Sequence, residues 1–431
     1  MIRRALLLAL APLALAAAPA SPEPSPLDGV ALDYVKLTLE IGEREPGYVD
    51  AYYGPAELQA EAKAHPRDVK TLAADTAALT ARLKAVDPAT LAPDERRRRT
   101  FLLGQLKAAE TRLAMLQGKK FSFVDEAEGL FGVRPALKPL SYYDGVIAKL
   151  EQLLPGSDPL ANRVAAHQRY DVIPRDKLDP VIRAAIAECR RRTYQHFTLP
   201  ANERFELEFV TGQPWSGYNW YKGDAHSLIQ VNTDSPVSFD HAIDLGCHEG
   251  YPGHHALNAR LEEKLTKGKG WIEFSVYPLF SPQSFIAEGS ANAGIRLAFP
   301  GDEEAAFEAA KLYPLASVDP SRMRLMTEDA ASKAIDDLDG ATLTVQAMYL
   351  DGAIDREGAI DLIRKYAFTS RAGAEQSLGF LEKYRSYVIN YGLGERMVTA
   401  TLEAGGAGPD ERWKRMEHII SEPTVPADLV Q

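Results

Sequence analysis

The amino-acid sequence predicts a mainly α-helical protein that carries one small β-hairpin. Most of the chain beyond residue 30 consists of segments rich in Ala, Leu, Glu, Lys and Arg, in which apolar residues recur three and four positions apart. Pro, Gly and Asp separate these segments, and only two short stretches alternate between apolar and polar residues. A chain of 431 residues is long enough for two or three domains or for one large helical domain. We predict a single domain over 31–431, with an N-terminal lobe (31–200) and a second lobe (201–431) as its finer division.

The first twenty residues have the layout of a secretory signal peptide. A pair of arginines precedes an apolar run over 5–18, which ends in the small-residue triplet Ala18-Pro19-Ala20. The run is shorter than the roughly 20 residues of a membrane-spanning helix, and Pro12 interrupts it. We therefore predict a signal peptide over 1–20, a proline-rich lead-in over 21–30, and export to the periplasm or beyond. An uncleaved signal would retain the protein at the membrane, but no later stretch is apolar enough for stable insertion after cleavage.

The predicted helices follow one another with few interruptions. Leu72–Val86 and Pro93–Gln117 show the clearest helical period, and both are rich in residues of high helix propensity. Apolar residues also flank a group of histidines in a helix predicted over Phe239–Leu265. The other predicted helices span 141–154, 179–197, 302–313, 320–338, 341–351, 356–368 and 374–391.

The exception to the helical pattern lies just before the histidines. Phe205–Val210 alternates between apolar and polar residues, and Ser227–Asn232 does so loosely, so both are predicted to be short strands. The long connection between them is rich in glycine and aromatic residues. Such a connection either covers a satellite hydrophobic cluster or forms one wall of a substrate cleft. Its aromatic residues are Trp215, Tyr218, Trp220 and Tyr221.

The charge excludes several classes of partner. The formal net charge is -11 and the pI is about 5.4, which argues against binding to nucleic acid or to an anionic membrane surface. The one basic run, 96–99, follows two acidic residues and is typical of a solvated helix face. Nothing in the sequence determines the oligomeric state.

The two cysteines, Cys189 and Cys247, allow one disulfide in an oxidising compartment. A bridge at Cys247 would constrain the group of histidines that starts at the next residue. We therefore favour two buried free thiols over a disulfide.

The segment His248-Glu-Gly-Tyr-Pro-Gly-His-His255 is the strongest functional signal. It places three imidazoles and one carboxylate within about two helical turns. Zinc hydrolases with a His-Glu-x-x-His motif hold two imidazoles on one helical face, and the intervening glutamate activates a water molecule. The segment therefore predicts a metal site with a general base.

The spacing leaves two candidates for the second histidine ligand. The residue four positions after His248 is Pro252, so the ligand must be His254 or His255. A straight helix returns His255 to the same face, but about 10.5 Å further along the axis. Pro252-Gly253 permits a bulge that would bring His254 round instead. We favour His254, and we expect His255 to face the cleft as a substrate-binding residue or to support the ligands.

Two glutamates complete the predicted site. Glu249 emerges about 100° around the helix from His248, where it can act as the base. Glu288 lies among small and apolar residues on a later helix and is predicted to be the third ligand. Without the rest of the motif, Glu249 would be interpreted as an ordinary surface residue. Glu288 would be interpreted as a partner of the helix dipole. Asp244 and Asn292 are each four residues from a ligand and could hydrogen-bond to the ligands.

A tyrosine-rich segment near the C-terminus offers further groups. Tyr384, Tyr387 and Tyr391 are three and four residues apart, on one face of the predicted helix. Tyr384 or Tyr391 could donate to an oxyanion, and Arg385 could bind the carboxylate of a short peptide. The alternative is an aromatic packing stripe.

The motif His-Glu-x-x-Pro-Gly-His-His over 248–255 and the downstream Glu288-Gly289 resemble the bacterial domain of unknown function (DUF) 885 family. The chain departs from that family at Ser290, where many members have tryptophan, and over 374–380, where a Pro-Gly-Gln-Ala-x-x-Tyr pattern is absent. The resemblance implies a mainly helical, zincin-like metallohydrolase with presumed peptidase activity.

The sequence thus predicts a zinc-dependent hydrolase that cleaves peptide or small amide substrates. One Zn²⁺ per chain would be held by His248, His254 and Glu288, with Glu249 as the catalytic base. One alternative is an esterase or another non-peptide hydrolase with the same site. Another is a non-catalytic, metal-stabilised binding protein, which would not need Glu249.

Overall fold

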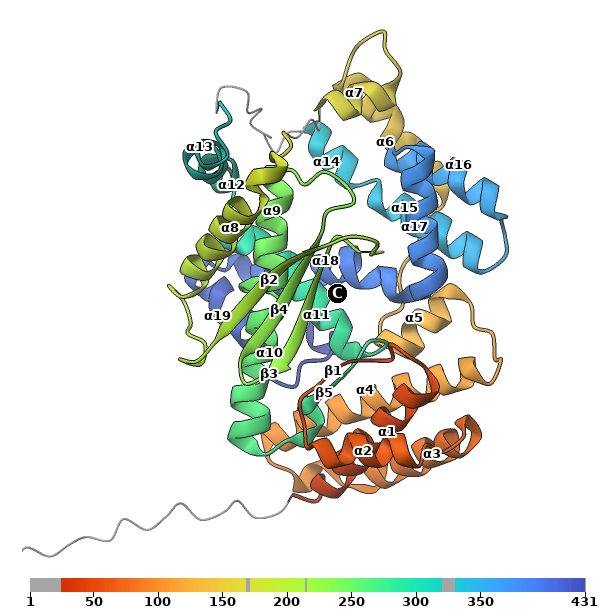
Figure 1. Ribbon diagram of the computed structural model, residues 1–431. Helices are drawn as coiled ribbons and strands as arrows, with labels where there is room; N and C mark the ends of the chain where they lie inside the picture. The colour runs from red at the N-terminus through yellow and green to blue at the C-terminus, as the bar shows by residue number, and fades with distance from the viewer. Residues whose placement is uncertain (1–24, 168–170, 214, 320–329, 431) are drawn as a thin grey trace, which may run out of the picture.

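The computed structural model describes residues 25–167, 171–213, 215–319 and 330–430 (Figure 1). These residues form a mainly helical fold with two small sheets, which confirms the predicted fold class. The predicted signal peptide lies outside the described residues. Within the described ranges, we find no helix that combines the length and the apolar composition of a membrane span.

Four of the eight helices of the N-terminal half begin and end within a few residues of the predicted segments, and the other four were not predicted. In α3, Leu72, Leu79 and Leu83 are buried, and the Asp68 carboxylate caps the helix by accepting a hydrogen bond from the Thr71 N–H. The apolar period that predicted this helix is therefore the face that packs on α1 and α4. The helices of this half are α1 (Asp28–Arg44), α2 (Ala56–Ala64), α3 (Val69–Ala85), α4 (Pro93–Leu116), α5 (Phe123–Phe131), α6 (Leu140–Leu153), α7 (Leu160–His167) and α8 (Leu178–Thr193).

The C-terminal helices depart from the predicted segments at two places. The segment 302–313 is helical but contains a π-helical turn, and the helix predicted over 374–391 is broken at Arg385. Arg385 has a φ of 54°, and its guanidinium and the Ser386 N–H both bind the buried Glu126 carboxylate. This contact from another helix stabilises a break that local periodicity does not reveal. The helices are α12 (Glu303–Phe307), α13 (Tyr313–Leu315), α14 (Ala330–Asp336), α15 (Asp339–Leu350), α16 (Arg356–Ala367), α17 (Arg371–Tyr384), α18 (Ile389–Glu403) and α19 (Pro409–Ile419).

The helices pack around two large hydrophobic cores. The larger core joins apolar side chains from α1 through to the C-terminal segment, and so includes residues from both predicted lobes. The smaller core is formed by α6, α7 and α14 to α17, which group together at the upper right of Figure 1. The break at Arg385 therefore separates α17, in the smaller core, from α18, in the larger one.

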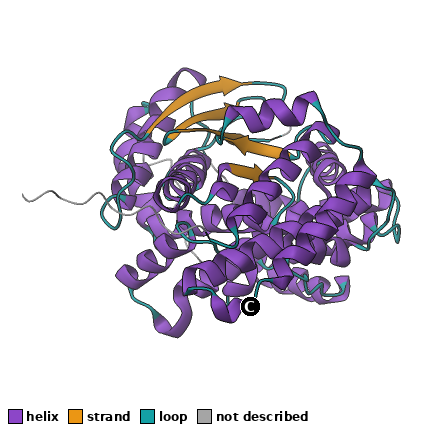
Figure 2. Cartoon of the chain, turned by 90° about the horizontal axis from the view of Figure 1, so that it is seen from below, coloured by secondary structure: helices purple, strands orange, loops and turns teal. Residues whose placement is uncertain are grey.

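The main sheet differs from the predicted hairpin. Its strands β2 (Arg204–Val210), β3 (Gly217–Gly223) and β4 (His226–Asn232) are ordered β2-β4-β3. The two predicted strands, β2 and β4, pair in parallel, and the segment predicted to be a loop contains β3, which forms the hairpin with β4. Asp224 and Ala225 make the two-residue turn with φ values of 55° and 51°. Glycines at its ends and aromatic residues on both faces hide the strand period of β3. Figure 2 shows the strands gathered on one side of the molecule.

A second sheet pairs two distant segments. Strand β1 (Val49–Tyr52) runs antiparallel to β5 (Val276–Pro278). The register shifts between Val49 and Ala51, which makes Asp50 the extra residue of a β-bulge.

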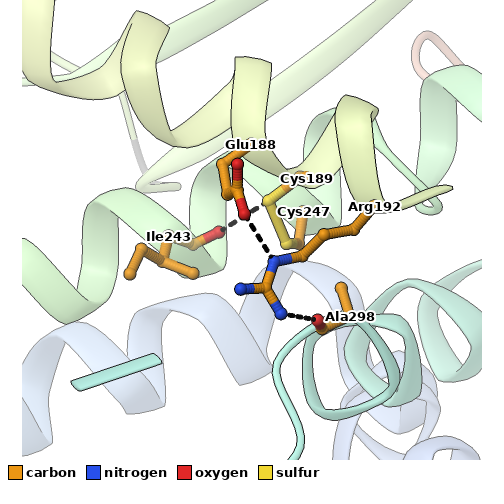
Figure 3. Close-up of a disulfide and its surroundings, with 6 residues drawn as sticks. All are labelled: Glu188, Cys189, Arg192, Ile243, Cys247 and Ala298. Atoms are coloured by element: carbon orange, nitrogen blue, oxygen red, sulfur yellow. Dashed lines mark hydrogen bonds and ion pairs between the residues drawn. A yellow bond between two sulfur atoms is a disulfide. The ribbon is translucent and has the colours of Figure 1, made fainter. Parts of the chain in front are cut away.

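Cys189 and Cys247 form a disulfide between α8 and the histidine-bearing segment (Figure 3). The preference for two free thiols was therefore wrong. Gly246 explains why: a Cβ at this position would lie 2.9 Å from the Ile186 nitrogen, so only glycine lets the two backbones approach this closely. The resulting Cα–Cα distance of 5.3 Å lies in the range that a disulfide spans.

Candidate metal centre

The histidine-bearing segment is not one continuous helix. Helix α9 (Phe239–Leu245) passes into a π-helical turn, η3 (Gly246–Gly250), and a bend with a cis Tyr251–Pro252 peptide bond precedes α10 (His254–Leu261). A second π-helical turn, η4 (Glu262–Lys267), follows. The segment predicted as a helix over Phe239–Leu265 is helical on both sides of residues 251–253, and the interruption lies at Pro252-Gly253, where the sequence permitted a bulge.

Gly253 is needed for this bend. A Cβ at position 253 would lie 1.8 Å from the His248 carbonyl oxygen and 2.5 Å from that of Cys247. The chain therefore folds back against its own backbone at a point where no other residue fits. This contact returns the start of α10 to the level of His248.

The bend brings together the three residues that were predicted to bind a metal ion. The Nε2 atoms of His248 and His254 are 3.1 Å apart. The Glu288 carboxylate, on α11 (Pro282–Ala298), has Oε2 3.3 Å from His248 Nε2 and Oε1 3.7 Å from His254 Nε2. One ligand atom from each residue lies within 4.8 Å of the others. Of the two candidate histidines, His254 is the one in this cluster.

Neighbouring side chains hold the cluster in orientation. The Nδ1–H of His248 donates to Asn292 Oδ1 at 2.8 Å, so Nε2 of that ring faces the cluster. The Tyr387 hydroxyl donates to Glu288 Oε1 at 2.7 Å. Asn292 thus has its predicted place beside one of the predicted ligands, whereas the contact of Tyr387 with Glu288 was not predicted.

Gly289 fixes the position of the helix that carries Glu288. A Cβ on Gly289 would lie 2.6 Å from the backbone carbon of Gly394, on α18. Helices α11 and α18 therefore contact each other backbone to backbone at the residue after the ligand. The Glu-Gly pair in the sequence combines a residue of the cluster with the backbone contact that positions it.

The electrostatics of the cluster favour positive charge at its centre. Burial opposes the charged form of Glu288, but His254 and His248 outweigh it and hold the pKa of this carboxyl well below its usual range. For His248, burial opposes the charged form and by itself would lower the pKa. The Glu288 and Glu249 carboxylates outweigh this effect and raise the pKa of His248 to about 9. A divalent cation would supply this positive charge to the Glu288 carboxylate and would bind the two imidazoles.

Glu249 lies beside the cluster with free capacity to accept a proton. The residue is 5% exposed, and its Oε2 accepts no hydrogen bond from any described residue. Burial, with the nearby Glu288, raises its pKa, while His248 and His254 act in the opposite direction. The Asn219 side chain fixes the local backbone by donating to the Glu249 carbonyl at 2.6 Å.

The cluster and Glu249 open into a cavity of about 450 Å³. One wall is aromatic and is formed by Trp215, which precedes β3, and by Tyr218 and Trp220 of β3, so this part of the segment lines a cleft. Tyr221 also lines the cavity, but it packs in a small satellite cluster with Tyr53 as well, so both interpretations of the aromatic segment apply to it. Other lining residues are Glu45, Asp50, Arg112, Asn258, Tyr277, Phe280, Phe380, Lys383, Tyr384, Tyr387 and Tyr391.

Three predicted residues do not take the expected place. His255 is fully buried, where its ring bonds to Ser227 and Glu203, so it does not face the cleft. Arg385 is held by Glu126 and is not free to bind a substrate carboxylate. Asp244 makes no hydrogen bond to a ligand within the described part of the chain, and burial raises its pKa to about 7.

Tyr384 and Tyr391 line the cavity as predicted, but Asp50 was missed. Its strand lies about 200 residues before the histidines in the sequence, and a lone aspartate in a short strand gives no local signal. Only the pairing of β1 with β5 brings it to the cavity.

The donor set fits one divalent metal ion. Two imidazole nitrogens and one carboxylate are the ligands of many zinc sites that keep an open position. Glu288 Oε2 accepts no hydrogen bond from the described residues despite its burial, which leaves a lone pair that a cation would use. The fold and the site thus define a mainly helical protein with a His-His-Glu centre suited to such an ion.

Comparison with known proteins does not identify a family. No family model and no curated protein match the sequence. Among the solved structures that resemble it are a "putative lipoprotein" from Colwellia psychrerythraea, with 14% identity and a TM-score of 0.48 over 80% of this chain and 65% of that one. An M32 carboxypeptidase from Deinococcus radiodurans R1 has 13% identity and a TM-score of 0.45 over 91% and 89%. A "putative lipoprotein of unknown function" from Shewanella oneidensis has 12% identity and a TM-score of 0.41 over 84% and 75%.

This chain therefore spans just under two thirds of the Colwellia protein. At such identities and TM-scores, these similarities assign no activity. The resemblance to the DUF885 family stays a prediction.

Proposed function

We propose that this protein is a zinc-dependent hydrolase that cleaves peptide or amide bonds. The observation that carries the proposal is the convergence of His248, His254 and Glu288 within 4.8 Å, at the wall of the cavity that Glu249 also lines. A site with only a structural role would need neither an open cavity nor a buried carboxylate with an unused oxygen beside the ligands.

The residues around the cluster have separate roles in such a reaction. A zinc ion held there would polarise the substrate carbonyl and lower the pKa of a water molecule. In this proposal, Glu249 takes the proton of the attacking water and delivers it to the leaving amine. Tyr384 and Tyr391 line the same cavity and offer O–H donors to an oxyanion. Burial, with Glu288, raises the pKa of Tyr391, which keeps this phenol protonated.

Export of the protein is part of the proposal. The disulfide between Cys189 and Cys247 supports an oxidising compartment, because such bridges are rare in the reducing cytosol. The resemblance of the octapeptide to the DUF885 family supports a peptidase over other hydrolases.

Replacement of Glu249 by glutamine tests the proposal. We expect Glu249→Gln to retain one metal ion per chain by elemental analysis, and to lose about 10²- to 10⁴-fold in kcat on a peptide library. The exposed Glu43→Gln is the matched control and should change neither quantity.

Two outcomes would count against this function. Wild-type protein without bound metal would contradict the metal site. A Glu249→Gln protein with full activity would contradict the assignment of Glu249 as the base. If ester substrates were cleaved and no peptide were, the site would belong to a non-peptide hydrolase.

A further inference from the structure

Asp50 is an acidic side chain that faces the cavity from outside the metal cluster. It is the extra residue of the bulge in β1, and β-bulges commonly re-aim one side chain out of the strand alternation. Both Asp50 and the ligands line the cavity, and the charges of His254, Glu288 and Glu249 all affect the Asp50 carboxyl. Asp50 therefore lies near the reacting centre without belonging to the cluster.

The Asp50 carboxylate has only part of its hydrogen-bonding capacity used. It accepts a hydrogen bond from the Tyr218 hydroxyl, and among the described residues it forms no ion pair. Glu45, another carboxylate of the cavity, is different because Arg112 donates to both of its oxygens at 2.9 Å. Asp50 is thus a cavity carboxylate without a cationic partner, in a chain where Glu45 has one.

The surroundings of Asp50 suit a positively charged group. The rings of Tyr218 and Trp220 lie 4.5 Å apart and those of Trp215 and Tyr218 5.3 Å apart, so an aromatic wall adjoins the carboxylate. Aromatic faces attract ammonium groups, and a buried carboxylate gains most from a cation that replaces its lost hydration. Burial raises the pKa of Asp50 to about 6, so the group is still mainly ionised at pH 7.

We infer that Asp50 and the aromatic wall form a subsite for the ammonium group of a peptide amino terminus. The site would then select short peptides with a free amino terminus, placing their first peptide bond at the metal centre. A cavity of about 450 Å³ is of the size that encloses a small ligand rather than a folded chain. This inference rests on the proposed function, because it assigns the substrate class of the same site.

Binding without turnover tests the subsite. Metal-loaded Glu249→Gln protein would be titrated by calorimetry with alanyl-alanine amide and with its N-acetyl derivative, both lacking a C-terminal carboxylate. We expect the free amine to bind about 10- to 100-fold more tightly at pH 7, the size of one charge-assisted hydrogen bond. Asp50→Asn in the same background should remove this preference.

The exposed Asp302→Asn is the matched control and should retain the preference. The preference should also persist after the metal is removed with a chelator, because Asp50 is not a ligand. Loss of the preference on chelation would show that the amine binds the metal instead, which would overturn the inference.

Equal binding of the two probes to Glu249→Gln protein, or no binding of either, would also overturn the inference, whatever the fold of the Asp50 variant. A preference that survives Asp50→Asn in folded protein would do so as well. None of these outcomes depends on hydrolysis, so they are distinct from failure of the proposed function.

Discussion

Two adjacent histidines on α10 lie in opposite kinds of site. His254 faces the cavity with His248 and Glu288. In this group, Glu288 Oε2 accepts no hydrogen bond from a described residue. His255 points into the protein, where Ser227 bonds to Nδ1 at 2.8 Å and Glu203 to Nε2 at 3.1 Å.

The carboxylate beside His255 is saturated by hydrogen bonds. The Tyr251 hydroxyl donates to Glu203 Oε2, while the Tyr194 hydroxyl and the Arg190 guanidinium donate to Oε1. Burial alone would raise the pKa of Glu203, but these donors outweigh it and lower the pKa to about 2. Each lone pair has a donor, so the group holds α8, β4 and α10 together.

The comparison shows that saturation, rather than composition, separates a structural histidine–carboxylate group from a candidate metal site. Both groups contain a buried carboxylate side chain, and both pair imidazole with carboxylate. Only the cluster of His248, His254 and Glu288 has an unused oxygen and an open cavity beside it.

The largest expected effect is loss of metal from a His254→Ala variant. Removal of one of three ligands should weaken zinc binding by more than about 100-fold, because even a residue that only supports a ligand contributes up to that factor. Zinc affinity measured by competition with a chromophoric chelator would check this.

His255→Ala is the matched comparison for that experiment. We expect it to bind one zinc ion per chain, while the loss of its two hydrogen bonds lowers the free energy of unfolding by about 1–3 kcal/mol. If His255→Ala lost the metal and His254→Ala kept it, the assignment of the two histidines would be reversed.

A smaller effect is expected from Asn292→Ala. Its Oδ1 accepts the Nδ1–H of His248, so removal frees the ring to rotate and should weaken zinc binding about 10- to 100-fold. The same chelator competition would measure it. Asn162→Ala, at an exposed position of α7, should bind zinc like the wild type. Unchanged affinity in Asn292→Ala would show that the hydrogen bond does not orient the ligand.

The smallest effect concerns pH and the saturated group. The pKa of Glu203 falls from 4.5 to about 2 on folding, so its stabilising contribution is complete above pH 4.5 and is lost as the pH falls toward 2. Urea unfolding of Glu203→Gln should therefore show a deficit in stability at pH 7 that shrinks between pH 4.5 and 2.

Glu206→Gln tests an exposed carboxylate that also pairs with a histidine, His226. We expect little change in its stability, because exposed ion pairs contribute little. A Glu203→Gln deficit that stayed constant with pH would show that the ionised carboxylate is not what stabilises the fold.

The sequence predicted the local features well because they depend on nearby residues. The apolar period located α3 and α4 to within a few residues, and the octapeptide with Glu288 contains the three cluster residues. Pro252 also excluded the usual four-residue spacing. These inferences needed only helical geometry and the chemistry of the side chains.

Other features depend on contacts between distant segments, which no local pattern encodes. The break at Arg385 rests on Glu126, 259 residues away, and the disulfide joins residues 58 apart. Tyr387 reaches Glu288 only because α11 and α18 touch at Gly289.

By itself, the sequence determined that the chain is mainly helical and that His248, Glu288 and one of two adjacent histidines form a group of metal-binding type. Only the tertiary structure decided between His254 and His255, and it brought Asp50 to the cavity. The physical reason is that the backbone contact at Gly253 sets the direction in which each histidine points, whereas β1 reaches the cavity through its pairing with β5.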